Sequence, residues 1–206
     1  MLYGYITEGK TIRLRQTERW GLPLYQAAML TGNGLAKWYR AHTWRRLRRL
    51  GVRRCIMEEK WQAEAAEFGI WPVETTALRL EVLPRFLTGL TGKTVVLRAH
   101  SADNDAVRAA CLLARKARYL TLEIPRGKEE LALELRRRYG LSGAGGHAAE
   151  TVDFTGTVPG AIAMVGGEMK CTIGGETVPE QAAVLLWELH RIKKEDLQVK
   201  SMPRNA

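Results

Sequence analysis

Apolar positions in the middle of the chain follow two alternating patterns. Continuous apolar runs of strand length, of which residues 95–97 are the clearest, alternate with stretches whose apolar residues recur every three or four positions. The first pattern is expected of strands buried on both faces, and the second of helices that cover a sheet. The patterns predict strands at 91–100, 119–125, 151–156 and 161–167, and helices at 103–117 and 128–140. The chain is therefore expected to be an α/β protein with a mostly parallel sheet covered by helices on both faces.

The flanking regions carry weaker versions of these patterns. They predict strands at 53–57 and 70–74, a helix at 58–69, a helix at 75–90 interrupted at Pro84, a hairpin around 166–175 and a final helix from Pro179. Ala182, Leu185, Leu189 and Ile192 form the apolar face of that final helix. Whether residues 1–40 pack on the same sheet or on another subunit stays open.

The glycines near 89–92 indicate a boundary between an N-terminal α/β segment, 1–90, and a second α/β domain, 91–206. One continuous sheet fits the pattern equally well. In that case Glu58 and Glu59, after the first short strand, would lie at the same sheet edge as the residues after 91–100.

The composition is that of an ordinary globular domain, with 206 residues, 46% hydrophobic and 26% charged. A formal net charge of +10 favours anionic partners without identifying one. Because no apolar run has the length of a signal peptide or a membrane helix, we expect a cytoplasmic protein with no membrane partner. Cys55, Cys111 and Cys171 are far apart and form no CxxC pair, so we expect reduced thiols and no metal site.

Much of the charge lies in TWRRLRRLGVRRC, residues 43–55, which contains six arginines. On a helical projection Trp44, Leu47 and Leu50 share one stripe, and the neighbouring arginines point away from it. A solvated face of an amphipathic helix is the favoured interpretation. The alternative is nucleic-acid or anion binding by the helix 40–54, with contacts from Arg40, Arg45, Arg48 and Arg49 and with stacking on Trp38, Tyr39 or Trp44.

Arg40 does not fit the solvated face, because it projects onto the apolar stripe. Either the helix begins after Arg40, or Arg40 is a partly buried charge that requires a carboxylate or an anion.

Residues 92–156 resemble the dinucleotide-binding half of Rossmann domains of the shikimate dehydrogenase and glutamyl-tRNA reductase type. The likeness lies in GKTVVL, a following helix, ARYLTLEI with Glu123 at the end of the second strand, the helix KEELALELRRRYG, and then VDFTG. The resemblance implies a Rossmann-like fold. In that family NAD(P) is held by a GxGxxG turn after the first strand and by an acidic residue at the position of Glu123.

The glycine fingerprint of that family is absent from this chain. The corresponding residues, RAHSADNDA, contain no glycine, and Asp103 and Asp105 would repel a pyrophosphate. The sequence therefore predicts a degenerate Rossmann-like domain without the usual NAD(P) binding. A second glycine-rich stretch, GLSGAGGH at 140–147, leads from a helix into a strand, which is the wrong order for a phosphate cradle.

The segment HSADND, residues 100–105, follows the central predicted strand, at the edge where open α/β sheets bind ligands. The candidate ligand-binding residues at this edge are His100, Ser101, Asp103, Asn104, Asp105, Glu123, Thr155 and Gly156. A histidine beside carboxylates is consistent with a general base or a cation ligand, but a helix cap next to a solvated histidine is the favoured interpretation. No residue is assigned a catalytic role, and no cofactor is identified.

The leading hypothesis is a non-catalytic Rossmann-like protein that binds a small ligand, a protein partner or a second copy of itself. The first alternative is a divergent NAD(P)-dependent oxidoreductase that uses residues 100–105 and Glu123. The second is a nucleic-acid-binding protein that uses the basic helix.

Overall fold

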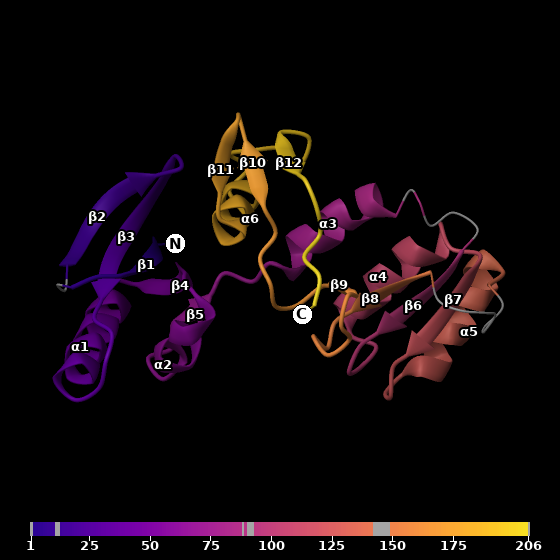
Figure 1. Cartoon of the computed structure of the whole chain (residues 1–206), viewed down its shortest axis with the longest axis horizontal. Helices are drawn as coiled ribbons and strands as arrows, with labels where there is room; N and C mark the ends of the chain where they lie inside the picture. Colours follow the sequence, from indigo (N-terminus) through magenta and orange to yellow (C-terminus); the bar gives the residue numbers. More distant parts are fainter. Residues whose placement is uncertain (1, 11–12, 88, 90–92, 142–148, 206) are drawn as a thin grey trace. The chain divides into compact units, whose positions relative to one another are not determined.

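The computed structural model describes residues 2–10, 13–87, 89, 93–141 and 149–205. The chain divides into two compact units, which Figure 1 colours along the sequence from indigo to yellow. The N-terminal unit contains residues 1–74 and 181–191, and the C-terminal unit contains residues 75–180 and 192–206. The expected boundary at 89–92 lies inside the second unit, and residues 90–92 are outside the described residues.

The strands of the described residues form three separate sheets, so the alternative of one continuous sheet is wrong. Glu58 and Glu59 follow a strand of the first sheet, whereas His100 follows a strand of another. They therefore do not share a sheet edge.

The N-terminal unit is built on a mixed sheet with the strand order β2-β3-β1-β4-β5. Its strands are β1 (Leu2–Glu8), β2 (Arg13–Arg19), β3 (Leu22–Met29), β4 (Val52–Ile56) and β5 (Trp71–Pro72). β1 is parallel to β3 and β4, β5 is parallel to β4, and β2 is antiparallel to β3. The first three strands come from the region that the sequence pattern left unassigned.

Two helices pack on one face of this sheet, as Figure 1 shows: α1 (Leu35–Arg49) and α2 (Gln62–Ala66), the latter preceded by the short 3-10 turn η1 (Glu59–Trp61). Their buried side chains form a core with those of the sheet: Ile6, Ala27, Met29, Trp44, Leu47, Val52, Cys55, Met57, Trp61, Ala65 and Ile70. Trp44 and Leu47 are fully buried in this core, as the projection of the basic helix predicts, whereas Leu50, at the end of the helix, is exposed.

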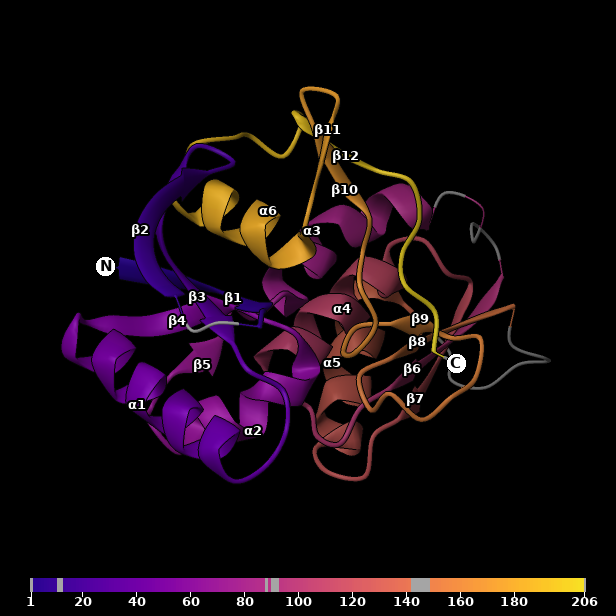
Figure 2. The ribbon, with the colours of Figure 1, turned by 60° about the vertical axis from the view of Figure 1, so that its left-hand side comes forward.

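Helix α6 (Glu180–Glu188) brings residues 181–191 back to the N-terminal unit, on the face of the sheet opposite α1 and α2 (Figure 2). The Gln181 side chain accepts a 2.7 Å hydrogen bond from Met57 N and donates one of 3.1 Å to the Met57 carbonyl. Glu188 pairs with Arg54 at 2.6 Å. The helix is shorter than expected, so Leu189 is 41% exposed and Ile192 lies outside it.

The C-terminal unit contains an all-parallel sheet with the strand order β7-β6-β8-β9. Its strands are β6 (Thr94–Arg98), β7 (Tyr119–Glu123), β8 (Glu150–Asp153) and β9 (Ile162–Ala163), and its helices are α3 (Thr76–Phe86), α4 (Asn104–Ala114) and α5 (Lys128–Tyr139). The predicted order of strands and helices from 94 to 163 is confirmed. Pro84 lies inside α3, so the expected interruption there is wrong; the helix ends two residues later, at Phe86.

The two faces of β6 and β7 differ in burial. Val95, Leu97, Leu120 and Leu122 are buried on one face, and α4 packs against both strands. On the other face Val96 and Thr121 are half-buried and Glu123 is exposed. This alternation differs from the continuous burial that a sheet with both faces covered would show.

A third, small sheet has the order β11-β10-β12, from β10 (Cys171–Ile173), β11 (Glu176–Val178) and β12 (Leu197–Val199). β10 and β11 form the predicted hairpin, whose turn contains Gly174 and Gly175 at positive φ. The glycine-rich stretch 140–147 begins with Gly140, the left-handed cap of α5, and its residues 142–147 are outside the described part of the chain.

A fully buried ion pair joins α3 to the start of α6 within the C-terminal unit. Arg79 binds both carboxylate oxygens of Glu180, at 2.6 and 2.7 Å. Its other three N–H groups donate to the carbonyls of Ala163, Gly166 and Gly167. All five guanidinium donors are therefore used, which is the condition under which a buried arginine is tolerated.

None of the helices in the described residues is long and apolar enough to cross a membrane.

Candidate functional site

The strand order of the parallel sheet reverses next to β6. The chain goes from β6 to β7 on one side and then places β8 on the other. In open α/β sheets ligands bind outside the carboxyl ends of the strands at such a reversal. A cavity of about 530 Å³ lies there, lined by Arg98, Ala99, His100, Glu123, Ile124, Pro125, Thr155 and Thr157. Its volume is within the range of small-molecule sites, roughly 300–1,000 Å³.

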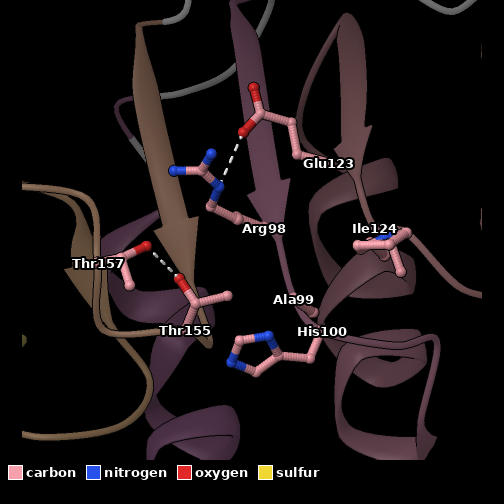
Figure 3. Close-up of a pocket in the computed structure, with 8 residues that line it drawn as sticks. Arg98, Ala99, His100, Glu123, Ile124, Thr155 and Thr157 are labelled. Atoms are coloured by element: carbon pink, nitrogen blue, oxygen red, sulfur yellow. Dashed lines mark hydrogen bonds and ion pairs between the residues drawn. The ribbon is translucent and has the colours of Figure 1, made fainter.

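Two pairs of polar side chains and one histidine line this edge pocket (Figure 3). Arg98, from the end of β6, pairs with Glu123, from the end of β7, at 3.1 Å between Nε and Oε2. The hydroxyls of Thr155 and Thr157, after β8, lie 2.6 Å apart. The pocket therefore offers N–H and O–H donors together with one carboxylate acceptor.

The loop after β8 is held by the buried carboxylate of Asp153. One oxygen accepts hydrogen bonds from the amide and the hydroxyl of Thr155, at 2.8 and 2.7 Å. The other accepts from the amides of Thr157 and Val158 and from the side chain of Asn205, at 2.8 to 3.0 Å. Burial raises the pKa of Asp153, but the hydrogen bonds from Thr155, Val158 and Thr157 outweigh burial, so that this pKa lies below its ordinary value.

The first turn of α4 is held in a similar way by Asp103. Its carboxylate accepts hydrogen bonds from Asp105 N and Ala106 N, at 3.1 and 2.9 Å, which is an N-cap. The helix cap that the sequence favours in this segment is therefore Asp103. At two strand ends, therefore, carboxylates of the protein already accept hydrogen bonds from backbone amides that would otherwise bind an anion.

The loops after β6 and β7 are in close contact at a glycine. Gly127, at the start of α5, has φ +79°, and a Cβ there would lie 2.9 Å from that of Ala102. Ala102 N donates to the Arg126 carbonyl at 2.9 Å. Only glycine meets both the backbone and the space requirement, so this contact positions the two loops beside the pocket.

Three of the candidate ligand-binding residues line the edge pocket: His100, Glu123 and Thr155. The others follow the same strand ends without lining it: Ser101, Asp103, Asn104, Asp105 and Gly156. Sequence reasoning missed Arg98, Thr157 and Asp153. Each lies within two residues of a predicted site residue, so their nearness to a strand end is the signal that was available.

The arginines proposed to contact nucleic acid divide into two groups. Arg40 is buried: its Nε binds Glu64 at 2.8 Å, and Nη1 donates to the carbonyls of Leu30 and Gly32. The helix does not begin later, and Arg40 has the carboxylate partner that was the other alternative. Arg48 is half-buried against Gly69, whereas Arg45 and Arg49 are exposed.

No protein-family model and no curated protein matches this chain. The residues that the structure describes also contain no group of three or more His, Cys, Asp or Glu side chains placed to hold a metal ion.

Proposed function

We propose that the C-terminal unit is a Rossmann-like ligand-binding module that holds a small polar molecule in the edge pocket without transforming it. The observation that carries the proposal is the position of the pocket at the strand-order reversal, with a charged pair and two hydroxyls in its wall. Binding sites of this kind are mostly preformed and use few polar groups to orient the ligand.

The strand order supports a ligand at this edge but not a dinucleotide. Counted from β6, the order β7-β6-β8-β9 is 2-1-3-4, the arrangement of flavodoxin-like sheets, whereas dinucleotide-binding halves have the order 3-2-1. Asp103 and Asp153 also accept hydrogen bonds from backbone amides that would otherwise contact a pyrophosphate. A divergent NAD(P)-dependent oxidoreductase is therefore the less supported alternative.

The pocket chemistry favours a ligand with both an anionic and a donor group. Arg98 uses Nε for Glu123, and its terminal nitrogens are the natural partners of a ligand carboxylate. Glu123 would accept from an ammonium or hydroxyl group, and the threonine hydroxyls serve either role. We infer that the ligand is a small amino acid or hydroxy acid.

The surroundings of His100 favour binding without catalysis. A general base is normally oriented by a second group, as a histidine is by a carboxylate. Within the described residues, no side chain forms a hydrogen bond with the exposed ring of His100. Such a histidine contributes to binding more readily than to a directed proton transfer.

Nuclear magnetic resonance tests this function on the whole chain. Amino acids and hydroxy acids are titrated one by one, with NADH and NADPH as comparisons, while backbone amide shifts are followed. We expect at least one acid to shift the amides of residues 98–100, 123–124 and 155–157, and the dinucleotides to leave them unchanged. Micromolar NADH or NADPH binding at these amides would favour the oxidoreductase instead.

Two threonine variants separate the pocket from the rest of the unit. Thr157→Val removes a hydroxyl that lines the pocket, whereas Thr177→Val removes an exposed hydroxyl on β11. We expect Thr157→Val to weaken binding of the acid and Thr177→Val to leave it unchanged. Equal affinities for the two variants would place the ligand elsewhere.

A further inference from the structure

The outward face of α1 exposes large apolar side chains together with arginines. This α1 face consists of Leu35, Trp38, Tyr39, His42, Arg45, Arg46 and Arg49, which fall on one side of the helix at about 100° per residue. Leu35, Trp38 and Tyr39 are 77%, 60% and 44% exposed. An ordinary solvated helix face has no need of exposed aromatic rings, and such groups mark interaction sites.

The aromatic rings of the α1 face are ordered by one another. Trp38 stacks on His42, with ring centroids 6.1 Å apart and an interplanar angle of 21°. Tyr39 meets Trp38 edge to face, with centroids 4.9 Å apart. The indole is therefore held by its neighbours while most of its surface stays accessible, which is how a stacking platform for a base is built.

The arginines of the α1 face carry uncompensated charge. In the part of the chain that the structure describes, Arg45, Arg46 and Arg49 have no ion-pair partner. None of the fifteen residues of α1 is acidic. Arg45 lies 5.7 Å from the centroid of the Phe68 ring, so its guanidinium is positioned without being neutralised. This arrangement is complementary to a chain of negative charges.

We propose that the α1 face binds single-stranded nucleic acid, with bases stacked on Trp38 and Tyr39 and phosphates paired with Arg45, Arg46 and Arg49. A polyanion matches the arginines, and unpaired bases match the accessible rings. A duplex keeps its bases inside the stack, and an acidic peptide has no planar bases, so neither uses the aromatic part of the face. The proposal concerns the N-terminal unit and does not depend on the ligand of the edge pocket.

Fluorescence anisotropy with labelled oligo(dT) and oligo(U) of about 20 nucleotides tests the proposal on the full chain. A triple variant, Arg45→Gln, Arg46→Gln and Arg49→Gln, removes three charges from the α1 face. The matched control, Arg136→Gln, Arg137→Gln and Arg138→Gln, removes three charges from the last turn of α5. Trp38→Ala removes the central ring without changing the charge, and its exposure makes it neutral for folding, which thermal unfolding checks.

We expect the α1 triple variant to lose at least tenfold in affinity, and its dependence of log K on log salt to become shallower by about 2. We expect Trp38→Ala to lose about tenfold in affinity with an unchanged salt slope, because one stacking contact is removed. The affinity of the α5 control should stay close to that of the wild type. Equal losses in the two triple variants, an unchanged Trp38→Ala, equal affinity for duplex DNA or for polyglutamate, or no binding at about 0.2 M salt would each overturn the proposal.

Discussion

At the scale of single residues, carboxylates organise the loops around the edge pocket. Asp153 is fully buried, and its carboxylate accepts hydrogen bonds from Thr155 and Thr157, which line the pocket, and from Val158, which follows them. A buried carboxylate is stable only when several donors compensate its lost hydration. The shape of the pocket wall after β8 therefore depends on the ionised form of this one residue.

Asp153→Asn should show this dependence as a function of pH. At neutral pH we expect the variant to lose about 1–3 kcal/mol of unfolding free energy, because its NH₂ group faces amide donors. The pKa of Asp153 is lower in the folded than in the unfolded chain, so its stabilisation is complete above the unfolded pKa, about 3.9, and disappears as the pH falls through the folded pKa.

Urea unfolding of both proteins from pH 7 down to about pH 3 measures this difference. The gap in unfolding free energy between wild type and Asp153→Asn should narrow below about pH 4. A gap that stays constant over this range would show that Asp153 stabilises the loop without being ionised.

At the scale of elements, the structure separates the helix cap from the pocket wall within the segment 100–105. The sequence favours a helix cap beside a solvated histidine, and the structure shows that the cap is Asp103. His100 is exposed, as expected, and also lies in the wall of the edge pocket. Two residues only three positions apart thus have different surroundings, because the chain turns from β6 into α4 between them.

Asp103→Ala should lower the unfolding free energy by about 1 kcal/mol, since two amides of α4 lose their acceptor. Asp103→Asn should retain most of the stability, because an asparagine oxygen also caps a helix. Thermal and urea unfolding measure both variants, with Asp105→Ala as the neighbouring control. If Asp103→Ala instead abolished ligand binding without a loss of stability, Asp103 would be a ligand contact and not a cap.

The elements that the sequence missed include the three strands before α1. β2 and β3 form a hairpin whose turn, Trp20 and Gly21, has positive φ at both residues. That geometry is usually signalled by Asn-Gly or Asp-Gly, and a tryptophan at the first position conceals it. The exposed strand β2 also has little apolar alternation of its own. β2 is positioned by its pairing with β3, which the pattern of apolar residues within β2 does not indicate.

At the scale of the whole molecule, the chain returns to its first unit after building the second. Residues 181–191 belong with residues 1–74, through the hydrogen bonds of Gln181 to Met57 and the pair of Glu188 with Arg54. The single boundary expected from the glycines near 89–92 would divide the chain into two continuous segments, whereas the N-terminal unit consists of two segments that are separate in the sequence. The N-terminal unit is therefore stabilised by a segment more than a hundred residues away.

Hydrogen exchange should reveal this connection. We expect Leu185→Ser, in α6, to accelerate amide exchange in β1 and β3 more than in β6 and β7, because a polar group is placed at a fully buried position of the N-terminal unit. Leu131→Ser, in α5, is the matched control, and it should produce the opposite distribution. Faster exchange in the same strands for both variants would show that the two units unfold together.

The sequence by itself determined the order of the described strands and helices between residue 94 and residue 163, because β6 contains a continuous apolar run and the helices have clear apolar spacing and end residues. It also placed His100, Glu123 and Thr155 at strand ends. Only the tertiary structure decided the strand order, which brings these residues into one pocket, and the partners of Arg40, Arg79 and Asp153. The physical reason is that periodicity reports which face of an element is buried, whereas the pairing of strands and charges depends on residues far apart in the chain.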